Sequence, residues 1–144
     1  MGYEIPREQP VSGVTVPVVA LLPRVHPDHY AVTVVDGHGR MGAAASLQLL
    51  GWESGALIFF TVEDRLITAA AVAGSVVPTT APRRVITARG HLNLPANIRR
   101  RAGIVGGDRL LLVADAQIGS LRIYSPKVLA LVLQSDLVRR GLRA

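Results

Sequence analysis

The sequence predicts a mainly β protein with short helices, built from two tandem copies of one unit and followed by a C-terminal helix. The apolar segments are short and bounded by glycine-containing turns, which is typical of short strands. The turn glycines recur with nearly the same spacing in both halves: Gly39, Gly51 and Gly55, then Gly90, Gly103 and Gly107. Because the surrounding apolar pattern also agrees, we interpret the glycine pattern as an internal repeat.

The repeat sets the expected domain organisation. We expect a loose, polar N-terminal tail at residues 1–13, a first copy at 14–73, a linker at 74–82, a second copy at 83–124 and a helix at 125–144. The linker, GSVVPTTAP, contains proline, threonine and glycine, which suit a connection better than a strand or helix.

The first copy is expected to contain an edge strand within 14–22, because Pro17 cannot donate to a central ladder. A strand at 30–35, a turn at 36–39, a helix at 43–50 and a hairpin of 58–62 with 66–72 follow. That helix carries Leu47 and Leu49 where the second copy has arginines. We therefore expect an apolar face there that packs against another element.

The second copy is expected to form strands at 85–86 and 92–94 around Gly90, then a helix at 95–102. Pro95 suits the first helical position, and Gly103 is placed to end the helix in the left-handed conformation. A turn at Gly107-Asp108 leads into a buried apolar strand at 109–114.

Three consecutive arginines lie on the predicted helix 95–102. Ile98 and Ala102 are four apart and share one face, so Arg99, Arg100 and Arg101 spread across the opposite side. We expect Arg100 to lie furthest from the core.

The C-terminal segment begins with a strand at 121–124. Ser125 followed by Pro126 is a favourable helix start, with the serine as N-cap. The helix then carries a broad apolar stripe and ends in arginines, which suit a helix C-terminus. We expect the stripe to be covered by the leucine face of the first copy or by a second subunit.

Composition excludes several classes of protein. With 49% hydrophobic and 18% charged residues the chain is not disordered, and no cysteine is present for disulfides, nucleophiles or thiolate metal sites. No apolar run reaches the roughly 18 residues of a membrane span. The start MGYEIPRE does not resemble a signal peptide, so we expect a cytoplasmic protein.

The sequence offers no constellation typical of a catalytic or metal site. The carboxylates do not pair, no serine lies in a nucleophile elbow, and no phosphate-binding glycine loop precedes a lysine. His26, Asp28 and His29 lie close together, but no further ligand completes a site, and we interpret them as a polar turn. We therefore expect neither an enzyme nor a cofactor.

Charge is distributed unevenly along the chain. Residues 1–82 carry four arginines against seven carboxylates, whereas residues 83–144 carry twelve Arg or Lys against three carboxylates. The net charges are thus −3 and +9. A basic half of this kind is typical of a nucleic-acid partner, although a solvated basic face is the alternative.

The second copy resembles the AbrB/MazE/SpoVT superfamily of swapped-hairpin DNA-binding domains. The resemblance rests on Gly90, Leu94-Pro95, Ile98-Arg99, Gly103-Ile104 and Gly107-Asp108, which stand in the family spacing. In that family two copies interleave their hairpins into one small barrel, and basic residues on the turn and short helix contact DNA. The residue after the turn glycine is commonly arginine there and is His91 here.

The first copy resembles a related two-copy family. Asp36 and Arg40 match the D-x-x-x-R motif of MraZ, a two-copy member of the superfamily that forms rings. The second copy has Thr87 and His91 at these places. The tandem arrangement is thus only loosely similar to MraZ.

The resemblance implies a bacterial DNA-binding transcription regulator, associated with the nucleoid. Its partner would be double-stranded DNA, and the protein would be a homodimer or a higher homo-oligomer. The expected phosphate contacts are Arg84, Arg89, Arg99, Arg100 and Arg101, with His91, Asn93 and Asn97 near base edges. Whether the hairpins interleave within one chain or between chains is left open.

The alternative is a protein-interaction module, such as an antitoxin or an adaptor. It would bind its partner through the leucine-rich first copy or the C-terminal helix. A MazE-like antitoxin usually carries an acidic unstructured tail, whereas this tail is predicted to be helical and basic, so the DNA-binding hypothesis is preferred.

Overall fold

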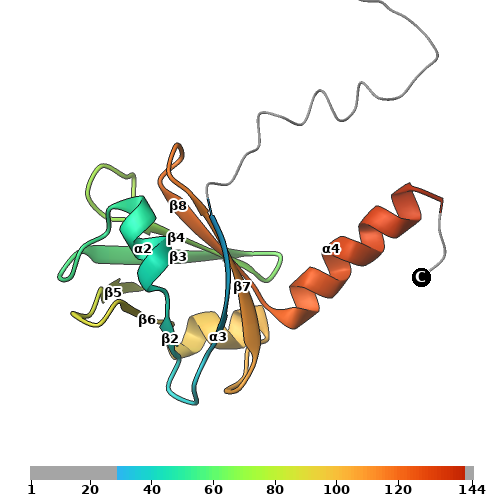
Figure 1. Ribbon diagram of the computed structural model, residues 1–144, viewed down its shortest axis with the longest axis horizontal. Helices are drawn as coiled ribbons and strands as arrows, with labels where there is room; N and C mark the ends of the chain where they lie inside the picture. The colour runs from blue at the N-terminus through green and yellow to red at the C-terminus, as the bar shows by residue number, and fades with distance from the viewer. Residues whose placement is uncertain (1–28, 142–144) are drawn as a thin grey trace, which may run out of the picture.

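The computed structural model describes residues 29–141 and consists mainly of antiparallel β-structure with short helices (Figure 1). The strands are β1 His29–Val34, β2 Arg40–Gly42, β3 Leu57–Glu63, β4 Leu66–Ala71, β5 Arg83–Val85, β6 His91–Asn93, β7 Arg109–Asp115 and β8 Ser120–Tyr124. The helices are α2 Ala44–Leu50, α3 Ala96–Ala102 and α4 Pro126–Arg139. The predicted mainly β class is confirmed. The predicted tail at 1–13, the predicted strand at 14–22 and the turn residues His26 and Asp28 lie outside the described residues.

The strands of the two halves pair with each other within the one chain. The six-stranded sheet has the order β1-β7-β8-β4-β3-β5, and β2 and β6 form a separate two-stranded ribbon. β1 of the first half pairs with β7 of the second, and β5 of the second pairs with β3 of the first. The counterpart strands β2 and β6, and β4 and β8, pair directly. The pairing pattern is therefore unchanged when the two halves are exchanged.

The turn glycines have matching conformations in the two halves. Gly39 and Gly90 have φ of 86° and 72°, Gly51 and Gly103 have 72° and 73°, and Gly55 and Gly107 have 90° and 93°.

The contacts of the first glycine pair are equivalent as well. The backbone N–H of Leu94 donates to the carbonyl of Gly39 at 2.8 Å, and that of Ala43 donates to Gly90 at 3.0 Å. Each turn is thus held by the residue that directly follows the ribbon strand of the opposite half.

The core is shared by both halves. Phe60 and Ile58 of β3, Leu110 and Leu112 of β7, and Ile98 of α3 are fully buried on its inner side. The ribbon closes this core with Met41 and Leu92, which are 2% and 0% exposed. Because strand side chains alternate, the other ribbon residues are directed outward.

The helix ends follow the predicted capping residues closely. α3 begins at Ala96, one residue later than expected, because Pro95 has the extended ψ of 149° and serves as the N-cap. Gly103 ends α3 with φ of 73° in the left-handed conformation. At the start of α4, Ser125 Oγ accepts the backbone N–H of Val128 at 3.2 Å, as predicted for an N-cap.

The expectation that the leucine face of the first copy packs against another element is confirmed for Leu47 and wrong for Leu49. Leu47 is 3% exposed and belongs to the core, because α2 packs against β7 and β1 with this side chain inward. Leu49 does remain exposed. α4 packs against β8 and extends away from the sheet, on the other side of the molecule from α2 (Figure 1). Its stripe is therefore not covered by the leucine face, and Leu131, Leu133 and Val138 are exposed.

Candidate nucleic-acid interface

The β2–β6 ribbon presents polar side chains from both halves. Its register pairs Arg40 with Asn93, Met41 with Leu92, and Gly42 with His91. Met41 and Leu92 are buried, so Arg40, His91 and Asn93 lie on the outward face beside Gly42. Two of the predicted base-contacting residues are thus neighbours on a narrow two-stranded surface.

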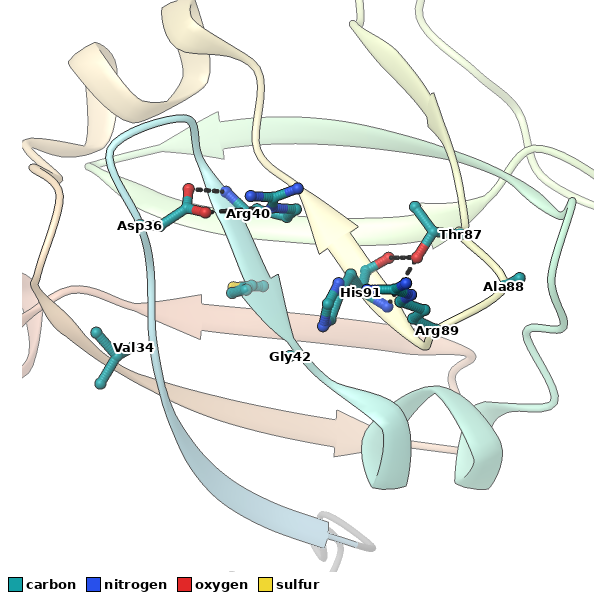
Figure 2. A pocket seen from close by; sticks show the side chains of 9 residues that line it. Val34, Asp36, Arg40, Gly42, Thr87, Ala88, Arg89 and His91 are labelled. Carbon is teal, nitrogen blue, oxygen red and sulfur yellow. Dashed lines mark hydrogen bonds and ion pairs between the residues drawn. The ribbon is translucent and has the colours of Figure 1, made fainter.

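A hollow of about 670 Å³ lies against this ribbon (Figure 2). Its lining includes Asp36 and Arg40 from the first half, and Thr87, Arg89 and His91 from the second. Gly42 contributes to the space because it has no side chain. A Cβ added there would meet His91 only at 3.9 Å, an ordinary van der Waals separation. The hollow can therefore admit a group from a partner between the two halves.

The first turn is organised by the carboxylate of Asp36. Asp36 Oδ1 accepts the backbone N–H groups of His38 at 2.8 Å and Arg40 at 2.9 Å. Arg40 Nε donates to Asp36 Oδ2 at 3.2 Å in an exposed ion pair. The backbone N–H of Arg40, together with that of His38 and the Arg40 guanidinium, holds the pKa of Asp36 below its ordinary value. The carboxylate partly neutralises Arg40.

The second turn has the same backbone arrangement without the carboxylate. Thr87 Oγ1 takes the place of Asp36 and accepts the backbone N–H of His91 at 3.1 Å. Arg89, at the tip of this turn, is exposed and makes no side-chain hydrogen bond or ion pair with another residue of 29–141. Its positive charge is available to an anionic partner.

The three arginines of α3 differ in their surroundings. Arg99 is half-buried and donates from Nε to the carbonyl of Leu94 at 3.1 Å and from a terminal nitrogen to Gly37 at 3.3 Å. It therefore ties α3 to the first turn.

The other two arginines are exposed, but only one is unattached. Arg101 donates to the carbonyl of Val62 at 3.1 Å, at the end of β3. Arg100 has no side-chain hydrogen bond or ion pair within the described part of the chain. Of the three, Arg100 is thus the one free to bind a phosphate without losing a contact.

The remaining predicted residues, Asn97 and Arg84, are not among those that line the hollow. Asn97 is exposed in the first turn of α3, and its Oδ1 accepts the backbone N–H of Ile98 at 3.0 Å. Arg84 is exposed on β5 at the edge of the sheet and donates to the carbonyl of Arg83 at 2.8 Å.

Arg40 was not among the predicted site residues. The structure places it opposite Asn93 on the same ribbon. The repeat offered a signal for this position, because Arg40 follows its turn glycine as His91 follows Gly90.

Within residues 29–141 no cluster of three His, Cys, Asp or Glu side chains could hold a metal ion. No helix in the same range is both long and apolar enough to cross a membrane. Comparison with known proteins gives neither a matching family model nor a matching curated protein.

Proposed function

We propose that the protein is a DNA-binding transcription regulator of the AbrB-like type. The observation that carries this proposal is the outward face of the β2–β6 ribbon, with the unpaired Arg89 on its turn and the unpaired Arg100 on the adjoining helix. Double-stranded DNA offers two kinds of group that this surface is suited to bind. Its phosphates attract the arginines, and its base edges present donors and acceptors to His91 and Asn93.

The dimensions of the ribbon suit the major groove. Neighbouring strands lie about 4.8 Å apart, and the major groove is about 12 Å wide and admits a two-stranded ribbon. Arginine pairs best with guanine and asparagine with adenine at this edge of the bases. Arg40 and Asn93, paired across the ribbon, are therefore suited to base readout, while Arg89 and Arg100 bind the backbone.

The interleaved strand pairing supports the resemblance to swapped-hairpin domains. In this chain the first strand of each half pairs with the third strand of the other half, β1 with β7 and β5 with β3. Two hairpins from one chain then take the places of two hairpins from two subunits. In this proposal the protein acts on DNA of the bacterial nucleoid, in the cytoplasm.

The dependence of DNA affinity on salt tests this function. If about six phosphates are neutralised, log K falls with log salt concentration at a slope of roughly −5. Fluorescence anisotropy of labelled mixed-sequence duplexes, titrated with the purified protein across a salt series, measures this slope. A flat salt profile would contradict DNA binding through the basic surface.

The Asp36→Asn substitution is expected to strengthen DNA binding. The amide oxygen can still accept the N–H groups of His38 and Arg40, so the turn is kept, but the ion pair with Arg40 is lost. We expect a roughly threefold to tenfold gain in affinity and a steeper salt slope, because the Arg40 guanidinium is no longer neutralised and the surface that faces the DNA loses an anionic carboxylate.

Asp64→Asn is the matched control for this charge change. Asp64 lies in the turn between β3 and β4, with φ of 51° that asparagine also adopts readily. Equal gains in the Asp36→Asn and Asp64→Asn proteins, measured by the same anisotropy titration, would show that net charge alone acts.

A second candidate function is a protein-interaction module, as in an antitoxin or adaptor. The observation that favours it is α4, where Leu131, Leu133 and Val138 are exposed along a helix that packs only its first part against β8. Exposed apolar patches are typical of contact surfaces. If no duplex is bound at low salt, this helix becomes the preferred functional surface.

A further inference from the structure

We infer that each chain recognises a DNA site with two different half-sites, rather than a palindrome. This inference rests on the proposed function and names the class of duplex that the ribbon selects. It follows from the way in which the two halves of the chain have diverged at equivalent positions on the proposed surface.

The equivalences come from the strand pairing. β2 and β6 are counterparts that pair antiparallel, with Met41 opposite Leu92 at the centre. The exchange of halves that relates Gly39 to Gly90 also relates Arg40 to His91 and Gly42 to Asn93. A ribbon made by two identical subunits would carry the same side chains on both sides of its centre.

In this chain β2 forms one side of the ribbon and β6 the other, and the outward side chains of the two strands differ in chemistry. One side presents a guanidinium paired with Asp36, beside the open space at Gly42. The other side presents the imidazole of His91 and the amide of Asn93, with Thr87 in place of the carboxylate. Because each side faces its own group of base edges, the two sides select different bases.

The flanking helices differ in the same sense. The repeat places Gln48 of α2 where α3 has Arg100, and both residues are exposed. The phosphates next to α3 therefore meet a free cation, while those next to α2 meet a neutral amide. This difference favours one orientation of the protein on the duplex.

Protein symmetry determines operator symmetry. Palindromic operators mirror the two-fold symmetry of homodimers that place one reading element on each half-site. Here one chain supplies both reading elements, and they are not identical. The selected site therefore has two unlike halves and needs one chain for each duplex.

Selection from a random duplex library by the full-length protein tests this inference. We expect the wild-type protein to enrich a consensus whose halves are unrelated by inversion. Replacing the Arg40 half-site by an inverted copy of the other should lower affinity about tenfold or more, since single mismatches already cost that much. Sedimentation with the enriched duplex should give one chain per duplex.

A symmetrised protein is the matched comparison. In the variant Asp36→Thr, Arg40→His and Gly42→Asn, both sides carry the residues of the second half. The space at Gly42 admits the new side chain, because its Cβ would lie 3.9 Å from the nearest atom of His91. We expect its consensus to approach an inverted repeat. If the triple variant has a much lower melting temperature than the wild-type protein, Arg40→His alone is tested instead. It should change the consensus only in the half-site that Arg40 contacts.

The outcomes separate the two proposals. Enrichment of a palindrome by the wild-type protein, two chains on one site, or retained duplexes without any consensus would overturn the inference and leave DNA binding intact. If no duplex is retained at low salt, the proposed function fails and the inference fails with it.

Discussion

The double substitution Arg89→Ala and Arg100→Ala is expected to weaken binding to mixed-sequence duplex DNA roughly 100-fold, about tenfold for each charged hydrogen bond lost. Both side chains are exposed, and neither makes a hydrogen bond or ion pair with residues 29–141, so their removal leaves the described fold intact. Two fewer phosphate contacts should also make the salt slope shallower by about 2. Anisotropy titrations at several salt concentrations measure both quantities.

The control removes the same charge from α4. Arg139 and Arg140 are exposed and both pair with Asp136, at 2.7 Å and 2.9 Å, on a helix that extends away from the sheet (Figure 1). Arg139→Ala with Arg140→Ala should change affinity much less. If both double variants lose affinity equally, long-range charge rather than the ribbon surface governs binding.

Local structure was predictable from the sequence where a residue type restricts the backbone. Gly103 marks the end of α3 because a left-handed residue with φ of 73° strongly favours glycine. Ser125 with Pro126 marks the start of α4 because the hydroxyl satisfies a free backbone N–H and the proline needs none. Such signals act within a few residues, so periodicity and turn chemistry suffice to find them.

The pairing of strands could not be predicted in the same way. The continuous apolar run at 110–113 indicates that β7 is buried, and the β-branched residues of β1 indicate a strand, but neither pattern selects a partner. The structure pairs them across a long stretch of chain, with His29 opposite Ala114 and Val34 opposite Arg109. This pairing within the chain places residues of both copies on one ribbon and so determines the composition of the candidate site.

The orientation of side chains on short helices was predicted only in part. The outward direction of Arg100 and the burial of Ile98 followed from helical spacing. The contacts of Arg99 with Leu94 and Gly37 did not, because Gly37 belongs to the other half and approaches only through the tertiary fold. The packing of Leu47 against another element was predicted, but its partner β7 was not, because β7 is far from α2 in the sequence.

Gly39→Ala is expected to destabilise the protein by about 3 kcal/mol or more, because an unfavourable backbone conformation and overpacking act together. Gly39 has φ of 86°, which an alanine rarely adopts. A Cβ there would overlap the carbonyl oxygen of Leu94 and lie 2.7 Å from Arg99 Nε. The same turn accepts the N–H of Leu94, so the substitution also strains the junction between the two halves.

Thermal or urea unfolding followed by circular dichroism measures this effect, and we expect the melting temperature to fall by about 10 °C for a chain of this size. Gly37→Ala is the control in the same turn. A Cβ at Gly37 would meet no atom within 4 Å, and its φ lies outside the left-handed region, so its effect should stay within about 0.5 kcal/mol. Similar stabilities of the two variants would contradict the close approach of the first turn to Leu94. A selective loss in Gly39→Ala would support the left-handed turn at Gly39 together with its close approach to Leu94.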